Sequence, residues 1–246
     1  MINNLAGLKN RISEREEAIA DANRPKANWF KIKENERVVV KFLQELDENA
    51  PKYNPAFGTF LGATEHQAPG PKGYLARALD TRELEGKDFA QELYMSDREK
   101  YKDLRPRENF YINVAVQTPD GVEAQILTRS LHSPFVQELI EIYEDDLPDG
   151  ITGVPIQIKR SGTGPQTTWR IKILGKEDDF DVSGVEPWDL SKSAVRHVTY
   201  DKQQEYYQRQ SDIDLGGGSS SSFKQQQEEQ SPFNTPQNDD DDGLGW

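Results

Sequence analysis

Residues 109–130, "NFYINVAVQTPDGVEAQILTRS", decide the fold class of this chain. In the first half of the stretch one set of side chains is apolar: Phe110, Ile112, Val114 and Val116. The residues between them are Tyr111, Asn113, Ala115 and Gln117. Alternation with a period of two predicts a strand that buries one face. "TPDG" is typical of a tight turn and a second strand follows it, so the stretch predicts a β-hairpin.

Two further stretches have the same period. In residues 28–44, "NWFKIKENERVVVKFLQ", an apolar set (Phe30, Ile32, Val38, Val40 and Phe42) alternates with Trp29, Lys31, Lys33, Arg37, Val39 and Lys41. This pattern predicts a hairpin with one apolar and one basic face. Residues 154–174, "VPIQIKRSGTGPQTTWRIKIL", predict a third hairpin that turns at "SGTG". Three separated hairpins predict a mainly β fold with α additions, built on a small barrel of five to six strands.

Helical patterns lie between and after these hairpins. Near Ser133, a cap residue, Pro134 begins a helix whose predicted packing face is Phe135, Val136, Leu139, Ile140 and Tyr143. A C-terminal helix is expected over 191–210. Residues 53–107 read as an irregular insertion in a core of residues 25–190, in which "DREKYKDLRPRE" is compatible with a helix before Pro106.

The two ends differ from this core. Residues 1–24 predict a helical arm with Leu5, Leu8, Ile12 and Ile19 near one face, which either packs on the body or touches a neighbouring subunit. Residues 211–246 are rich in Gly, Ser, Gln and Asp and predict a disordered tail. The tail closes with "NDDDDGLGW", in which Trp246 is either an anchor for a partner or the end of a solubility appendage.

Composition narrows the functional classes. The 246 residues carry a net charge of -13, and the tail from Ser211 holds eight acidic residues and one basic residue. A polyanion responds to the local field of a surface, so this balance does not exclude nucleic acid. The chain has no cysteine, which excludes disulfides and thiolate chemistry. No run of eighteen apolar residues occurs, so we expect a soluble, cytoplasmic protein.

The sequence contains no catalytic constellation. His66, His132 and His197 are far apart and form no HExxH pattern, and "SGTGP" lacks the lysine of a phosphate-binding loop. The acidic runs "EDDLPDG" and "EDDFD" lack calcium-loop spacing. We therefore expect no enzymatic activity, no cofactor and no metal, although a two-metal carboxylate site built from distant residues stays an alternative.

Basic residues gather in the third predicted hairpin. Residues 151–176 contain five bases and no acid, in a chain where acids are in excess. Strand parity places Trp169 toward the core, whereas Trp29 and Tyr111 lie opposite apolar residues and are expected on an outer face. Bases mixed with exposed rings suit single-stranded nucleic acid. The predicted DNA-binding residues are Trp29 and Tyr111 for stacking, and Lys31, Lys33, Lys41, Lys159, Arg160, Arg170 and Lys172 for phosphates.

"WFKIKENERVVVKFL", "RENFYINVAVQTPDG", "SPFVQELIEIY" and "IKRSGTGPQTTWRIKIL" together resemble the phage single-stranded DNA-binding proteins related to the helix-destabilising protein of T-even phages. The resemblance covers residues 28 to about 174. It implies an OB-fold core, an N-terminal self-association arm and an acidic C-terminal tail. It also implies a role in coating DNA during phage replication, recombination and repair in the bacterial host cytoplasm.

The chain differs from many members of this family in one region, and its end resembles a second group of proteins. Many members carry a zinc subdomain with Cys and His ligands in the region that matches 65–92, where this chain has His66 and no cysteine. We therefore expect packing or partial disorder there instead of zinc. The chain end is similar to that of bacterial single-stranded DNA-binding proteins, whose terminal aromatic docks on replication enzymes. This implies that the tail competes with DNA and recruits replication or recombination proteins through Asp239, Asp240, Asp241, Asp242 and Trp246.

Two other functions are compatible with the sequence. A metal-dependent nuclease or other replication enzyme built on the basic face would turn over DNA. A virion assembly protein with an acidic tail would bind no oligonucleotide at all.

Overall fold

A computed structural model describes residue 15 and residues 26–215 of the chain. Seven strands form one antiparallel sheet in the order β3-β2-β4-β1-β6-β7, and β5 pairs with β4. The strands are β1 (Arg37–Phe42), β2 (Leu61–Pro69), β3 (Leu75–Leu79), β4 (Arg107–Thr118), β5 (Gly121–Ser130), β6 (Pro155–Ser161) and β7 (Thr168–Ile173). The predicted mainly β class is confirmed. The sheet stays open, however, so the predicted closed barrel of five to six strands is not seen.

Helices are few and short. The α-helices of the described residues are α2 (Arg82–Glu85), α3 (Phe89–Ser96), α4 (Pro134–Asp146), α5 (Leu190–Ser193) and α6 (Tyr200–Gln210). Single 3-10 turns occur at η1 (Pro71–Gly73), η2 (Lys102–Leu104), η3 (Gly164–Gln166) and η4 (Lys176–Asp178). Within the described part of the chain, every helix is too short or too polar to traverse a lipid bilayer. The predicted arm over 1–24 lies outside the described residues, apart from the exposed Arg15.

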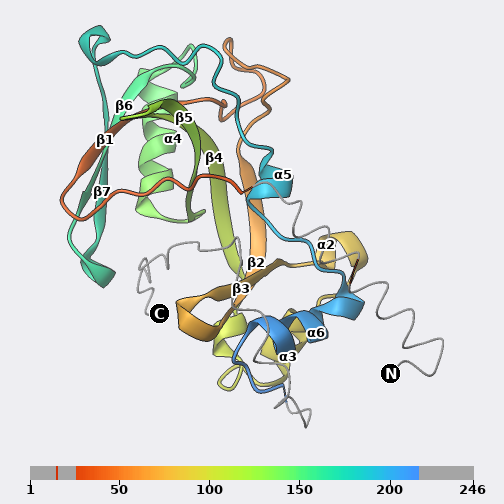
Figure 1. The fold of residues 1–246 in the computed structure, drawn as a ribbon. Helices are drawn as coiled ribbons and strands as arrows, with labels where there is room; N and C mark the ends of the chain where they lie inside the picture. The colour runs from red at the N-terminus through yellow and green to blue at the C-terminus, as the bar shows by residue number, and fades with distance from the viewer. Residues whose placement is uncertain (1–14, 16–25, 216–246) are drawn as a thin grey trace.

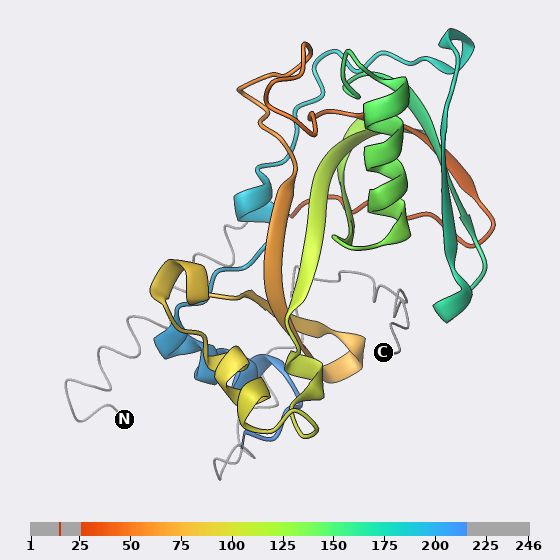
Figure 2. The ribbon, with the colours of Figure 1, turned by 180° about the vertical axis from the view of Figure 1, so that it is seen from behind.

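The elements gather into two lobes that are joined by the long strand β2 (Figures 1 and 2). The sheet lobe contains β1, β4, β5, β6, β7 and α4, and the hairpin lobe contains β3, α2, α3, η2 and α6. Strand β2 runs between them, because it pairs with β4 over 61–65 and with β3 over 65–69. Glu65 is the crossover residue, since it has Leu79 on one side and Arg107 on the other.

The main core of the sheet lobe lies between the sheet and α4. The alternation in β4 is confirmed, because Phe110, Ile112, Val114 and Val116 all belong to this buried cluster. Leu139 of α4 is fully buried against it. Ile140, predicted on the same helix face, is 45% exposed instead. The buried residues of α4 are therefore Phe135, Val136 and Leu139.

The opposite face of β4 and β5 is covered as well, which the sequence analysis did not expect. The segment 179–195 packs over it and buries Tyr111, Asn113 and Ala115. Trp188 fixes this cover, since its indole Nε1 donates to the Ala124 carbonyl at 2.8 Å and its backbone N–H donates to the Asn113 side chain at 2.9 Å. A strand covered on both sides leaves no outer face at its centre.

The predicted hairpin over 28–44 is wrong. Strand β1 begins only at Arg37, and it pairs with β4 and β6 instead of with the residues before it. Residues 28–30 lie along the edge of β5, where the Phe30 N–H donates to the Ile126 carbonyl at 2.9 Å and the Ile126 N–H donates to Asn28 at 2.8 Å. These residues cap an edge strand, because an unpaired edge needs partners for its backbone groups.

The predicted irregular insertion over 53–107 contains regular structure. It supplies β2, β3, α2 and α3, and the stretch 97–106, where the sequence is compatible with a helix, contributes the 3-10 turn η2 instead. The expected C-terminal helix over 191–210 is divided into α5 and α6. Tyr207 of α6 is buried with Ala76 and Ala78 of β3, and Ile213 and Leu215 pack against the same cluster. The first residues of the predicted tail are therefore part of the hairpin lobe.

Candidate nucleic-acid interface

The third predicted hairpin is confirmed as β6 and β7, and its turn depends on a glycine. Gly162 has φ +81, and a Cβ atom placed there would lie 2.4 Å from the Gln166 carbonyl oxygen. Val38, Ile158 and Ile171 are cross-strand neighbours on β1, β6 and β7, and all three pack in or against the main core. The residues that flank this apolar row must therefore point to the other face of the sheet.

The other face carries what we call the basic row: Arg37, Lys159 and Arg170. Arg37 lies directly opposite Lys159, and Lys159 lies directly opposite Arg170, so three cations stand side by side across three strands. Lys172 follows on the same face of β7, opposite Gln157. All four basic side chains are exposed. The register therefore brings together Lys159, Arg170 and Lys172 as predicted, and it adds Arg37, which the predicted set omitted.

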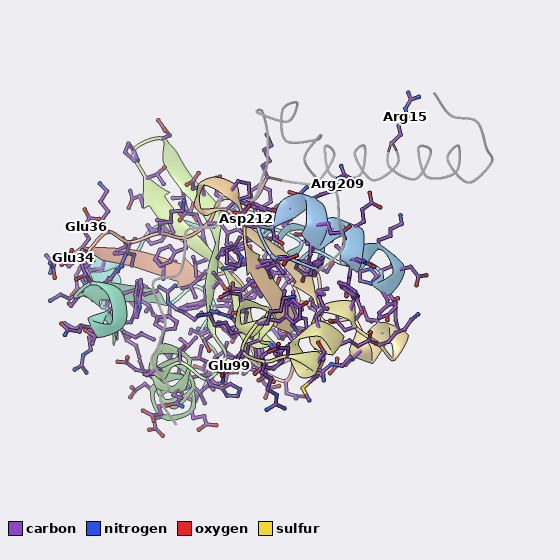
Figure 3. The ribbon with its side chains drawn as sticks, turned by 90° about the horizontal axis from the view of Figure 1, so that it is seen from below. Arg15, Glu34, Glu36, Glu99, Arg209 and Asp212 are labelled. Atoms are coloured by element: carbon purple, nitrogen blue, oxygen red, sulfur yellow. The ribbon has the colours of Figure 1, made fainter. Side chains whose placement is uncertain are left out.

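The charges of the basic row are not balanced by ion pairs. Within residues 26–215, no ion pair is formed by Arg37, Lys159, Arg170 or Lys172. Like charges directly opposite each other in a sheet are destabilising. Glu34 and Glu36 are exposed in the turn that precedes β1, at the rim of the molecule (Figure 3). The face thus keeps an excess of positive charge bounded by a few acids.

The remaining predicted bases divide into two groups. Lys31 and Lys33 are exposed in the segment that leads to β1. Arg160 is partly buried on the inner side of the hairpin, where its Nη1 donates to the Ile32 carbonyl at 3.2 Å. Lys31 and Lys33 are free to contact an external anion near the basic row, whereas Arg160 mainly fastens the segment before β1 to β6.

Trp169 lies on the inner face, as the parity predicted. It packs against the main core, and its ring meets that of Phe135 edge to face with centroids 6.4 Å apart. The Arg129 guanidinium lies 3.6 Å from the Trp169 ring centroid, which is a close cation–π contact. This ring is engaged by protein on one side and is no open stacking platform.

Tyr111 is a correction, because it has no exposed area. Its hydroxyl donates a short hydrogen bond to the Glu65 carboxylate, which also accepts from the Asn109 amide at 2.8 Å. Burial, together with the charge of Glu65, raises the pKa of Tyr111 well above its ordinary value. Strand parity predicted this ring on an open face, but the cover over β4 and β5 encloses it.

Lys41 and Trp29 are corrections of a similar kind. Lys41 is 6% exposed, and its ammonium group pairs with Asp179 and donates to the Phe180 carbonyl. The hydrogen bond from Lys41 holds the pKa of Asp179 below its usual value. Trp29 is partly buried and meets the Tyr111 ring edge to face at 6.2 Å. Neither side chain stands beside the basic row on an open surface.

A cleft beside β2 and α2 has the wrong chemistry for phosphate. Its volume is about 820 Å³, and it is lined by Leu61, Leu79 and Leu84 among others. Its charged lining consists of Arg82, Asp80, Glu83 and Glu108, so acids outnumber the single base. Phosphate groups are bound by positive charge, which favours the basic row as the candidate interface.

One further cluster has no signal in the sequence. His66, Asp80 and Asp88 offer three potential metal-ligand atoms within 4.8 Å of one another, in the hairpin lobe. His66 lies on β2, Asp80 follows β3 and Asp88 precedes α3. The pairing of β2 with β3 and the hydrogen bond from the Thr81 N–H to Asp88 bring the three side chains together. The partner-binding candidates Asp239, Asp240, Asp241, Asp242 and Trp246 lie outside the described residues.

Scans of the chain against protein-family models, curated proteins and solved structures return no match. The functional argument therefore rests on the basic row and on the sequence resemblance.

Proposed function

We propose that this protein binds single-stranded DNA on the face that holds the basic row, and that it coats and protects DNA during phage replication, recombination and repair. The observation that carries the proposal is the direct opposition of Arg37, Lys159 and Arg170 on three adjacent strands. Such an arrangement is unfavourable in the isolated fold. A phosphate backbone relieves the repulsion, since each neutralised phosphate also releases counterions.

Strand connectivity supports an OB-fold-like core as part of the same proposal. Strand β1 pairs with both β4 and β6, β4 and β5 form a hairpin, and β6 and β7 form another. Helix α4 lies between β5 and β6 in the chain. The insertion after β1 and the turn of the β6–β7 hairpin then occupy the positions of the two loops that bind oligonucleotides in OB-folds.

Single strands are proposed over duplex DNA because of the sequence resemblance, which includes the β6–β7 hairpin itself. The described residues hold no exposed large aromatic side chain, since the exposed large hydrophobic residues are Leu84, Met95 and Ile140. We therefore propose that phosphate contacts, more than base stacking, supply the affinity. Sequence-independent binding with a steep dependence on salt follows from this.

Catalysis is not part of the proposal, and neither is a cofactor. The acidic tail is proposed to compete with DNA for the basic row and, when DNA displaces it, to recruit replication or recombination proteins through Trp246 and the four preceding aspartates. We also propose that residues 1–24 mediate self-association between neighbouring copies of the protein.

The test is a titration of the full chain with fluorescent oligo-dT at two salt concentrations. We expect sequence-independent binding that duplex competes for poorly. Arg37→Glu and Arg170→Glu should each weaken binding, whereas Lys102→Glu, which changes an exposed base on η2, is the matched control. Each lost phosphate contact should make the negative slope of log K against log salt less steep by about 0.7.

Three results would count against the proposal. Equal losses of oligo-dT affinity for the two basic-row variants and for the control would show that the basic row is not the binding site. Absence of binding at low salt would favour a virion assembly protein. Magnesium-dependent cleavage of a labelled oligonucleotide would favour a nuclease.

A further inference from the structure

The segment that covers β4 and β5 also reaches β1, on the face of the sheet that holds the basic row. Lys41 lies opposite Pro155 of β6, in the same register that sets Arg37 opposite Lys159. Because side chains alternate along a strand, residues 37 and 41 share one face. At about 3.3 Å per residue, these two positions are roughly 13 Å apart along β1. Lys41 therefore continues the basic row, but beneath a peptide segment.

We call this segment, residues 175–187, the acidic strap. Its sequence, "GKEDDFDVSGVEP", contains five acidic residues and one basic residue. In Figure 1 it runs from the end of β7 to α5. The five acidic residues are exposed. The apolar residues of the strap are partly buried and pack against the sheet: Phe180, Val182 and Val185. The strap thus presents an apolar side to the sheet and carboxylates to the solvent.

The strap surrounds the ammonium group of Lys41 with two kinds of chemical group. Nζ pairs with the Asp179 carboxylate and donates to the Phe180 carbonyl at 2.5 Å. The centroid of the Phe180 ring lies 5.2 Å from the same nitrogen, within the range of a cation–π contact. A carboxylate and an aromatic ring resemble the phosphate and the base that a nucleotide presents to a lysine in single-stranded DNA complexes.

The strap is attached weakly between two firm ends. At one end the Leu174 N–H donates to the Pro155 carbonyl at 2.9 Å, and at the other end Trp188 is fixed by hydrogen bonds to β4 and β5. Within residues 26–215, the backbone hydrogen bonds of the strap itself close only local turns. Segments of this kind open at a low cost in free energy. The strap can therefore leave the sheet without the unpairing of any strand.

The charge of the strap is unexpected for a purely structural cover. Leu43, Ala115 and Ala124 form the small apolar cluster beneath it, and uncharged side chains would cover them equally well. A DNA strand that extends from Arg37 toward Lys41 would instead meet the carboxylates of the strap. Like charges placed side by side at an interface are strongly unfavourable. The DNA must therefore end before the strap, or the strap must move.

We propose that the acidic strap occupies part of the surface that binds single-stranded DNA, and that DNA displaces the strap and takes over Lys41. A phosphate then replaces the Asp179 carboxylate, and a base replaces Phe180 over the apolar cluster. This inference rests on the proposed function, because it extends the basic row toward β4. The strap is distinct from the acidic tail, since it belongs to the described fold and competes with DNA whether or not the tail is present.

The decisive measurement is the labelling of single thiols, which is simple because the chain has no native cysteine. Val182→Cys places a thiol on the partly buried side of the strap, and Ser183→Cys places one at the exposed neighbouring position. Saturating oligo-dT should raise the labelling rate of Val182→Cys several-fold, because the strap leaves the sheet. The labelling rate of Ser183→Cys should stay unchanged.

The possible failures of this experiment are distinguishable. If oligo-dT binds both variants but Val182→Cys stays as protected as in the free protein, the strap does not move and the inference is refuted, while the proposed function stands. If the wild-type chain binds no oligo-dT at low salt, the proposed function is refuted and the inference falls with it.

Oligo-dT affinity provides a second test that needs no cysteine. Asp179→Asn removes the ion pair with Lys41, whereas Asp178→Asn removes the same charge from the neighbouring exposed position. Asp179→Asn should tighten binding more than Asp178→Asn, by up to about fivefold, which corresponds to the strength of a partly exposed ion pair. Equal effects of the two variants would show that DNA binding does not break the contact with Lys41, and would overturn the inference.

Discussion

The burial of Tyr111 changes its expected role from base stacking to stabilisation of the fold. An exposed ring would contribute to base stacking, but this ring is enclosed and its hydroxyl serves the buried carboxylate of Glu65. Tyr111→Phe should leave oligo-dT affinity unchanged and lower the free energy of unfolding by about 1 to 3 kcal/mol, because Glu65 loses a donor without regaining water. Denaturant unfolding measures this loss.

Tyr53→Phe is the matched control for that experiment, since Tyr53 is partly exposed in the loop before β2. A weaker complex with DNA for Tyr111→Phe, at unchanged stability, would restore the stacking role.

Asp80 links stability to pH. Burial raises the pKa of its carboxyl, but hydrogen bonds from Arg82 and the charge of His66 lower it more, so the pKa lies below the ordinary 3.8. A depressed folded pKa contributes stability above the unfolded value, and this contribution is lost as the pH falls through the folded pKa. Asp80→Asn should therefore cost about 1.5 to 3 kcal/mol at neutral pH, and the difference from wild type should shrink below pH 3.8.

Unfolding free energies of the two proteins across this acid range measure the effect. Asp201→Asn, at a side chain that is 88% exposed, should show almost no difference at any pH. A difference between wild type and Asp80→Asn that is constant with pH would mean that the charge of Asp80 is not the cause.

At the scale of the element, the cations of the basic row lower the stability of the fold and are proposed to raise its affinity for DNA. Lys159 has a cation directly opposite it on each side, so Lys159→Gln should raise the free energy of unfolding by roughly 0.2 to 1 kcal/mol. The same change should weaken oligo-dT binding and reduce its salt slope by about 0.7. Residues that destabilise a fold are kept where function requires them.

Lys102→Gln provides the comparison, because Lys102 is an exposed base outside the sheet lobe. If Lys159→Gln gains stability but binds DNA as tightly as wild type, the basic row does not bind DNA.

The period of two in the sequence predicted the strands of the hairpins over 109–130 and 154–174 and the core side of β4. It failed for the segment before β1, because Trp29 and Phe30 alternate like a strand yet serve only to cap the edge of β5. Alternation reports which residues are buried but does not name the strand that pairs with them. The cover over Tyr111 could not be predicted either, since it comes from residues 188–195, which follow Tyr111 by 77 residues or more.

The candidate site was predicted only in part, because alternation shows on which face a side chain lies but not which strands are neighbours. Parity placed Lys159, Arg170 and Lys172 on one face, and the structure agrees. The alignment of Arg37 with them depends on strand register, which only the pairing of β1 with β6 establishes. Lys41 could not be recognised as buried, because its partner Asp179 belongs to a loop that returns over β1.

At the scale of the whole molecule, the contacts of the last described residues, up to Leu215, determine where the tail should be cut. The Asp212 N–H donates to the Pro69 carbonyl at 2.8 Å, and Ile213 and Leu215 pack on the hairpin lobe. Figure 3 shows Asp212 next to the end of α6. Truncation after Gln210 would therefore remove packing together with charge, whereas truncation after Leu215 removes six acids and one base and leaves the lobe intact.

The truncation after Leu215 is the last prediction. If the acids compete with DNA for the basic row, the shortened protein should bind oligo-dT more tightly at low salt and unfold at the same denaturant concentration as wild type. The gain in affinity should shrink as salt screens the field of the tail, because the Debye length falls to about 10 Å at 0.1 M.

Deletion of Trp246 alone keeps every aspartate, so it should leave the affinity for DNA unchanged. It should abolish the binding of a partner protein that needs an aromatic anchor. The pair separates electrostatic competition from docking: unaltered affinity after truncation would eliminate the first, and intact capture of replication proteins without Trp246 would eliminate the second.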